Sequence, residues 1–138
     1  MILRGLLCIS ILAVATPAPA AEDFIEGVYL ESEDLCAQAK KDTLDTVIEA
    51  GNIVLSARGL QSVEYDCEFL QITKATLSPS WAVTAICQEP GHVFPDVLSV
   101  TQMSPKQIDL VSVRPAGEES EPSGNGGSYF LCDGVALP

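Results

Sequence analysis

The chain has 138 residues, of which 19 are acidic and 7 are basic, and its formal net charge is −12. Nucleic acids and anionic membranes require basic surfaces, so a charge of this sign and size excludes both as partners. The length is enough for one domain with a single hydrophobic core.

The first twenty residues have the three parts of an export signal. Arg4 is the basic n-region, Leu6 to Val14 form a short apolar h-region, and Ala18-Pro19-Ala20 matches the small-residue cleavage pattern. The apolar run is shorter than the roughly 20 residues that a transmembrane helix needs. We therefore predict a signal peptide over residues 1–20 and a single periplasmic domain, without stable membrane insertion, over residues 21–138.

The N-terminal part of this domain combines strand and helix signals. Gly27 to Leu30 is typical of a strand, and Ser32 is positioned to cap a short helix over Glu33 to Lys41, with acids in its first turn and lysines in its last. Thr46 to Glu49 and Ile53 to Ser56 are rich in β-branched residues around Ala50-Gly51-Asn52, which predicts a hairpin. The alternative is a helix from Thr43 to Ala50.

Two alternating runs, Glu64 to Gln71 and Trp81 to Cys87, are the best-specified strands. The larger or sulfur-bearing side chains occupy odd positions, which places them on one face of each strand. These residues are Tyr65, Cys67 and Phe69 in the first run, and Trp81, Val83, Ala85 and Cys87 in the second. We interpret Trp81 and Tyr65 as core residues, and the alternative is a platform for a ligand.

The remaining segments continue the β pattern. After the turn Glu89 to His92, Val93 to Val100 predicts a strand that Pro95 places at a sheet edge or at a bulge. Further short strands are expected at Gly59 to Gln61, Ile108 to Val113 and Ser128 to Cys132, with a polar loop over Arg114 to Gly127. The fold class is mainly β: a small antiparallel barrel or a compact two-sheet β-structure, with one short helix.

Four cysteines remain once Cys8 leaves with the signal peptide: Cys36, Cys67, Cys87 and Cys132. An even number in an oxidising compartment predicts two disulfides. A zinc site would need closely spaced ligands, and the only histidine is His92, so we expect neither a metal nor a cofactor. Of the three possible pairings we favour Cys36–Cys67 and Cys87–Cys132, because each joins a connection or an end strand to a central strand.

No arrangement of residues indicates catalysis. His92 lies in a Pro-Gly turn, which favours a solvated side chain over a general base. The serines show neither a nucleophile elbow nor a Ser-x-x-Lys pattern, and oxidised cysteines offer no thiolate. We therefore predict that the protein is not an enzyme. A deep pocket at Trp81 or Tyr65 beside an acid would favour the alternative of an enzyme or a small-molecule carrier.

The loop before the last strand is the strongest binding candidate. Glu118, Glu119 and Glu121 place three carboxylates ahead of Ser123 and Gly124. The loop lacks the D-x-D-x-D-G spacing of a calcium site. The simplest interpretation is a solvated loop. The functional interpretation is an acidic loop that enters the cleft of a cationic protein, in a complex that salt weakens.

Two resemblances accompany these patterns. Gly27-Val28-Tyr29, Cys36, Cys67, the Trp81-to-Cys87 strand and the Tyr129-to-Cys132 end resemble small periplasmic proteins of unknown function from alphaproteobacteria, which implies no activity. Ser123-Gly124 followed by Tyr129 is similar to the Ser-Gly-x-x-Tyr motif of periplasmic inhibitors of C-type lysozyme. In this chain the tyrosine lies two residues further along, and a serine precedes it where a basic residue is common.

The second resemblance implies a small antiparallel barrel that inserts a Ser-Gly loop into the enzyme's cleft. The partner-binding residues would then be Glu118, Glu119, Glu121, Ser123, Gly124 and Tyr129. We accordingly predict a non-enzymatic, exported binding protein that acts on a cationic partner. The alternative is a structural domain for envelope maintenance.

Overall fold

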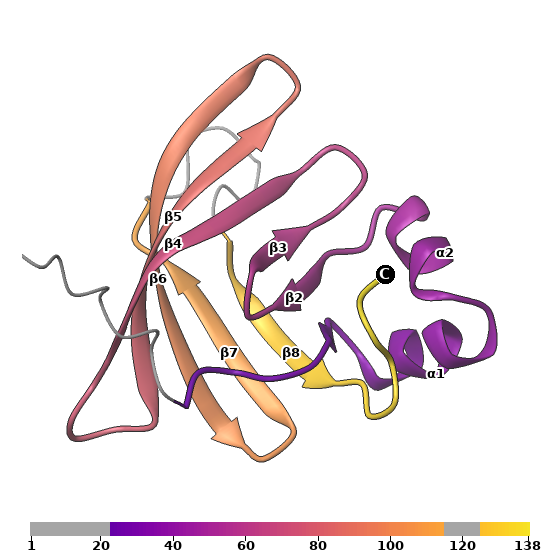
Figure 1. Cartoon of the computed structure of the whole chain (residues 1–138), viewed down its shortest axis with the longest axis horizontal. Coiled ribbons are helices and arrows are strands. Elements are labelled where there is room, and N and C mark those ends of the chain that lie inside the picture. The colour runs from indigo at the N-terminus through magenta and orange to yellow at the C-terminus, as the bar shows by residue number, and fades with distance from the viewer. Residues whose placement is uncertain (1–22, 115–124) are drawn as a thin grey trace, which may run out of the picture.

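The computed structural model describes residues 23–114 and 125–138. The predicted signal peptide and the loop residues Glu118, Glu119, Glu121, Ser123 and Gly124 lie outside these ranges. The described part forms a closed antiparallel barrel in which each strand pairs with its neighbours in chain order (Figure 1). Its strands are β1 (Tyr29–Leu30), β2 (Val54–Ser56), β3 (Gly59–Gln61), β4 (Asp66–Lys74), β5 (Ser80–Glu89), β6 (His92–Ser104), β7 (Gln107–Ser112) and β8 (Gly127–Leu131).

The ring is closed by the pairing of β1 with β8, where Tyr29 lies opposite Leu131 and Leu30 opposite Phe130. The prediction of a mainly β fold is therefore confirmed, and of the two predicted architectures the barrel is the one that forms. Closure gives each of these short strands a partner on both sides, whereas a two-stranded hairpin alone is only marginally stable in water.

The alternating faces of β4 and β5 lie as predicted. Trp81, Val83, Ala85 and Cys87 are all buried in the barrel interior, as is Cys67. A bulge between Phe69 and Gln71 shifts the β4 register. Leu70 is exposed, as alternation places it, and after the bulge Ile72 packs against the core while Gln71 is exposed.

Two helices cover one side of the barrel (Figure 1). The predicted helix α1 (Glu33–Lys41) is confirmed, and the Ser32 Oγ accepts from the Leu35 N–H at 3.2 Å as its cap. Among the described residues, neither helix is long and apolar enough to cross a membrane.

The predicted hairpin over Thr46 to Ser56 is wrong, because its first half forms helix α2 (Leu44–Glu49). The Thr43 side chain caps this helix by accepting from the Thr46 N–H. At its end Gly51 adopts φ +87°, and the Asn52 N–H bonds to the Val47 carbonyl. These are the contacts of a Schellman motif. Helical spacing buries Leu44 and Val47 together, so the alternative helix was the correct interpretation.

Every residue of β1 and β2 is buried, because both faces of these strands are covered. One face lines the barrel interior and the other packs under the helices. The interior cluster contains Leu55, Leu60, Trp81, Val83, Leu98, Val100, Ile108, Leu110 and Tyr129. The cluster under the helices contains Val28, Leu30, Cys36, Ala39, Leu44, Val47, Val54 and Cys132.

The two predicted disulfides form, but their favoured pairing is wrong. The bridges are Cys36–Cys132 and Cys67–Cys87. Cys67 and Cys87 lie directly opposite each other in the β4–β5 ladder, and their side chains share the barrel interior. Cys36 is on α1, and it belongs with Cys132, which follows β8, to the cluster outside the barrel. It therefore pairs with Cys132 and not with Cys67.

Pro95 lies at an edge, as predicted. β6 pairs with β5 from His92 to Thr101, with Pro95 opposite Ile86, but its pairing with β7 starts only at Leu98. No described strand therefore pairs with the outer side of β6 at Pro95, which is the position where a missing N–H costs no ladder bond.

Removing the Cys36–Cys132 bridge should destabilise the protein more than removing the Cys67–Cys87 bridge. The first bridge closes a loop of 96 residues, whereas the second closes a loop of 20 residues. In the loop-entropy model the free energy of unfolding falls by about 4–5 kcal/mol for Cys36→Ser with Cys132→Ser, against about 3 kcal/mol for Cys67→Ser with Cys87→Ser. Urea denaturation measures both. Peptide mapping that links Cys36 to Cys67 would contradict the observed pairing.

Gly59 should tolerate no side chain. A Cβ at this position would lie 1.7 Å from the Cys67 carbonyl oxygen, and the backbone has φ +145°. We expect Gly59→Ala to lower the free energy of unfolding by at least about 3 kcal/mol. The matched control is Gly51→Ala, which also has positive φ but meets no atom within 4 Å, and it should cost only about 1–2 kcal/mol. Equal losses in the two variants would show that the close approach of β3 to β4 is not required.

Candidate functional site

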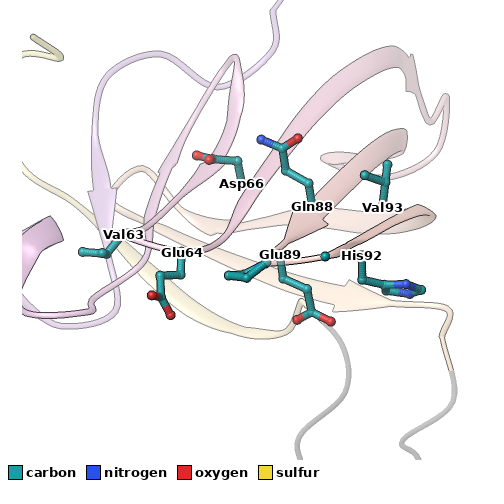
Figure 2. Close-up of a pocket in the computed structure, with 9 residues that line it drawn as sticks. Val63, Glu64, Asp66, Gln88, Glu89, His92 and Val93 are labelled. Atoms are coloured by element: carbon teal, nitrogen blue, oxygen red, sulfur yellow. The ribbon is translucent and has the colours of Figure 1, made fainter.

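One end of the barrel carries a concentration of carboxylates, and we call it the acidic end. It is formed by the turn between β5 and β6 and by the segment that leads into β4. An open groove of about 400 Å³ lies here between Val63, Glu64 and Asp66 on one side and Glu89, His92 and Val93 on the other (Figure 2). A second groove of about 480 Å³ adjoins it and adds Glu49 and Tyr65.

Glu64 and Glu89 belong to both grooves. Their carboxylates project to the same side, while Asp66 and Gln88 point the other way (Figure 2). Val63, next to Glu64 in the chain, is 56% exposed, whereas Val93, which is 64% exposed, projects on the side of Gln88 (Figure 2). Such a surface offers both negative charge and apolar contact to whatever binds there.

Two tight turns position these side chains. Gly91 adopts φ +78°, so the β5–β6 hairpin turns at Pro90-Gly91 and sets Glu89 opposite His92. On the other side, the Ser62 N–H donates to the Tyr65 carbonyl at 2.7 Å, and this turn projects Val63 and Glu64 outward.

Below the grooves lies a buried polar cluster centred on Asp96, which is only 3% exposed. Its carboxylate accepts hydrogen bonds from the Ser112 hydroxyl at 2.7 and 2.9 Å, from the Asn125 amide at 2.9 Å and from the Val97 N–H at 2.8 Å. A buried carboxylate without such donors would be strongly destabilising. These bonds therefore fix Ser112 and Asn125 around a single acid.

Asn125 connects this cluster to the surface and to a disulfide. Its Oδ1 accepts from the Tyr65 hydroxyl at 2.5 Å, and its Nδ2 lies 3.4 and 3.5 Å from the sulfurs of Cys67 and Cys87. Tyr65 in turn lines the second groove. Ser112, the last residue of β7, and Asn125, two residues before β8, are thus held at the acidic end, and Glu118, Glu119 and Glu121 lie between them in the sequence.

Aromatic contacts complete this end of the barrel. The guanidinium carbon of Arg114 lies 3.9 Å above the Phe94 ring, and the rings of Tyr65 and His92 approach Phe94 at 6.5 and 5.3 Å. His92 is exposed at the start of β6, where the sequence placed a solvated histidine. The Arg114 stacking holds the chain against the barrel at the point where the loop begins.

Tyr129 is not at the surface. Its side chain is 1% exposed inside the barrel, and burial, with a smaller effect of Glu31, raises its pKa above the ordinary value. We therefore correct the prediction that Tyr129 contacts a partner, because in this fold it is a core residue. The other predicted contact residues lie outside the described ranges.

Sequence reasoning missed Asp96, Ser112 and Asn125. One signal was available, because Asp96, Leu98 and Val100 alternate on the inward face of β6. An acid at an inward position implies a buried polar cluster with donors from elsewhere in the chain. Nothing local to Asn125 identified it as one of those donors. Within residues 23–114 and 125–138, no group of three or more His, Cys, Asp or Glu side chains lies close enough to hold a metal ion.

Comparison with known proteins found no matching family model, no matching curated protein and no matching solved structure.

The Tyr65 hydroxyl should stabilise the fold at neutral pH and lose this effect at alkaline pH. Burial, then the nearby carboxylate of Asp96, raises the Tyr65 pKa. A raised pKa favours the neutral form in the folded state, so the stabilisation is complete below the unfolded pKa of about 10 and is lost as the pH rises through the folded value.

Tyr65→Phe leaves the Asn125 Oδ1 without its donor and should cost about 1–3 kcal/mol at neutral pH. The difference in unfolding free energy between wild type and Tyr65→Phe should narrow above about pH 10, as followed by urea denaturation. A difference that stays constant with pH would show that the Tyr65 hydroxyl does not titrate in this environment.

Proposed function

We propose that the protein is a non-enzymatic binding protein of the periplasm, and that its acidic end holds a cationic segment of a partner protein. The signal peptide that the sequence predicts in residues 1–20 supports the location. The binding role depends on one observation: Glu64, Glu89 and the exposed Val63 line both of two adjoining open grooves.

This combination suits a lysine or arginine side chain. Both have an apolar stem that packs on hydrophobic surface and a charged head that stays near water. Val63 offers contact to the stem, while Glu64 and Glu89 offer charge-assisted hydrogen bonds to the head. A neutral apolar ligand would leave these carboxylates desolvated, so the grooves favour a cation.

The scaffold beneath the grooves supports binding without a large rearrangement. The two strands that form the groove walls are joined by the Cys67–Cys87 bridge, and Asn125 ties that bridge to Tyr65 and Asp96. Side chains on such a fixed base lose less conformational freedom on binding than side chains on a loose one. Glu118, Glu119 and Glu121, which the sequence predicts as partner-binding residues, follow Arg114 in the chain and stay part of this proposal as further negative charges.

A C-type lysozyme is the most concrete candidate partner, because the Ser123-Gly124 pair is similar to the motif of periplasmic lysozyme inhibitors. The chain's charge of −12 would attract such a cationic enzyme from a distance and speed its encounter with the acidic end. Binding over the enzyme's cleft would then inhibit it.

The test compares two double variants that each remove two negative charges. Glu64→Gln with Glu89→Gln should raise the dissociation constant for lysozyme between about twofold and thirtyfold, since each of the two exposed charge pairs contributes about 0.2–1 kcal/mol. Glu26→Gln with Glu33→Gln is the matched control, because both residues are exposed and lie away from the grooves. Calorimetry at about 0.01 M and about 1 M NaCl gives the affinities, and wild-type binding should weaken with salt.

Equal affinities for the two double variants would contradict binding at the grooves. If excess protein leaves lysozyme activity unchanged, lysozyme is not the partner. A pull-down from periplasmic extract at the same two salt concentrations then decides whether another cationic protein binds to the wild type and not to Glu64→Gln with Glu89→Gln.

A further inference from the structure

The outer face of β5, β6 and the end of β7 carries no charge. Strand alternation directs ten exposed side chains outward here, and none is ionisable. They are Ala82, Thr84, Ile86, Gln88, Val93, Pro95, Val97, Ser99, Val111 and Val113, and we call this surface the uncharged face. It stands out in a chain with 19 acidic residues and a net charge of −12.

The apolar members of the uncharged face are neighbours. Ile86 lies opposite Pro95, and Val97 lies beside Val113, whose N–H donates to the Val97 carbonyl at 2.9 Å. Val111 is opposite Ser99, next along the strands. Exposures of 37% for Ile86, 39% for Val97, 61% for Val111 and 67% for Val113 show that these side chains are open to solvent. A contiguous exposed patch of this kind marks an interaction surface.

The borders of this face are polar. Glu68 on β4 lies opposite Ile86, and Asp109 on β7 is the outward residue before Val111. Glu89 and His92 bound it at the hairpin turn. An apolar centre with a charged rim is the usual anatomy of a protein–protein interface. Figure 1 shows both helices on the other side of the barrel, so neither of them covers this face.

Edge-to-edge pairing through β6 is disfavoured. The Val97 carbonyl points towards the β7 side, where it accepts from the Val113 N–H. Val93 and Pro95 lie four and two residues earlier in the same strand, so their backbone groups point to this side as well. No described strand pairs with them there. Pro95 brings no N–H to that edge, which blocks the addition of another strand. Association must then occur through the side chains of the face, as in the packing of two sheets.

We infer that the uncharged face is a homodimer interface, occupied by a second copy of this chain. Two copies carry the same negative charge and repel each other, and the repulsion is smallest where neither surface holds an ionised group. A two-fold axis through this face brings identical apolar surfaces together and keeps the acidic rims at the periphery. A cationic protein gains nothing at this face and is attracted to the acidic end.

Salt separates this dimer from the partner complex proposed above. Screening weakens the attraction of a cationic partner, whereas it relieves the repulsion between two acidic copies. In sedimentation velocity experiments on the purified, oxidised protein, we expect a monomer–dimer equilibrium whose dissociation constant falls at least about tenfold between about 0.01 M and about 1 M NaCl. Glu64→Gln with Glu89→Gln should dimerise at least as tightly as the wild type, because it removes negative charge from the rim and leaves the uncharged face intact. The two proposals therefore fail independently.

Val111→Glu places a charge at the face and should raise the dimer dissociation constant more than about tenfold. Val97→Glu is a second variant with the same expectation. The matched control is Leu77→Glu, which adds the same charge at a position 99% exposed in the β4–β5 turn and should dimerise like the wild type. Near-ultraviolet circular dichroism from the buried Trp81 verifies that each variant is folded.

A protein that stays monomeric at high concentration in about 1 M NaCl would overturn the inference. So would folded Val111→Glu and Val97→Glu variants that dimerise as well as Leu77→Glu. A monomeric protein that binds uncharged phosphatidylcholine vesicles, and loses this binding with Val111→Glu, would overturn it in favour of a lipid surface.

Discussion

The whole architecture depends on closure of the sheet, where the two-residue strand β1 meets β8. This seam is short, and three further contacts support it: the Cys132 N–H donates to the Val28 carbonyl, the Cys36–Cys132 disulfide joins α1 to the end of β8, and the helix cluster packs over the outside. An open sheet would expose the edges of β1 and β8 and part of the interior cluster. The helices and the longer disulfide loop are therefore part of what makes the barrel possible.

The opposite end is held together by polar contacts. Asp96 is buried because Ser112, Asn125 and a backbone N–H satisfy its carboxylate, and Asn125 also reaches Tyr65 and the Cys67–Cys87 bridge. Removing one member of such a cluster leaves the others buried and unpaired, which makes the geometry of this end specific. The proposed binding grooves lie directly on this rigid base.

The distribution of charge divides the molecule into functional regions. Carboxylates gather around the grooves of the acidic end, and the outer face of β5 and β6 holds none. In a chain with excess negative charge, an evenly solvated surface would show acids on every outward strand face. The two proposed associations, with a cationic partner and with a second copy of the chain, would respond in opposite ways to salt.

By itself, the sequence determined what depends on near neighbours. Period-two alternation placed Trp81, Val83 and Cys87 in the core, Ser32 capped α1, and Pro95 marked an edge of β6. Only the tertiary structure decided what depends on residues far apart in the chain. The segment from Thr43 to Ala50 has both helical and β preferences, and burial of Leu44 and Val47 on one helical face selected the helix. The disulfide pairing and the Asp96–Asn125 contact follow from strand register and barrel closure, because these bring together side chains that local sequence cannot relate.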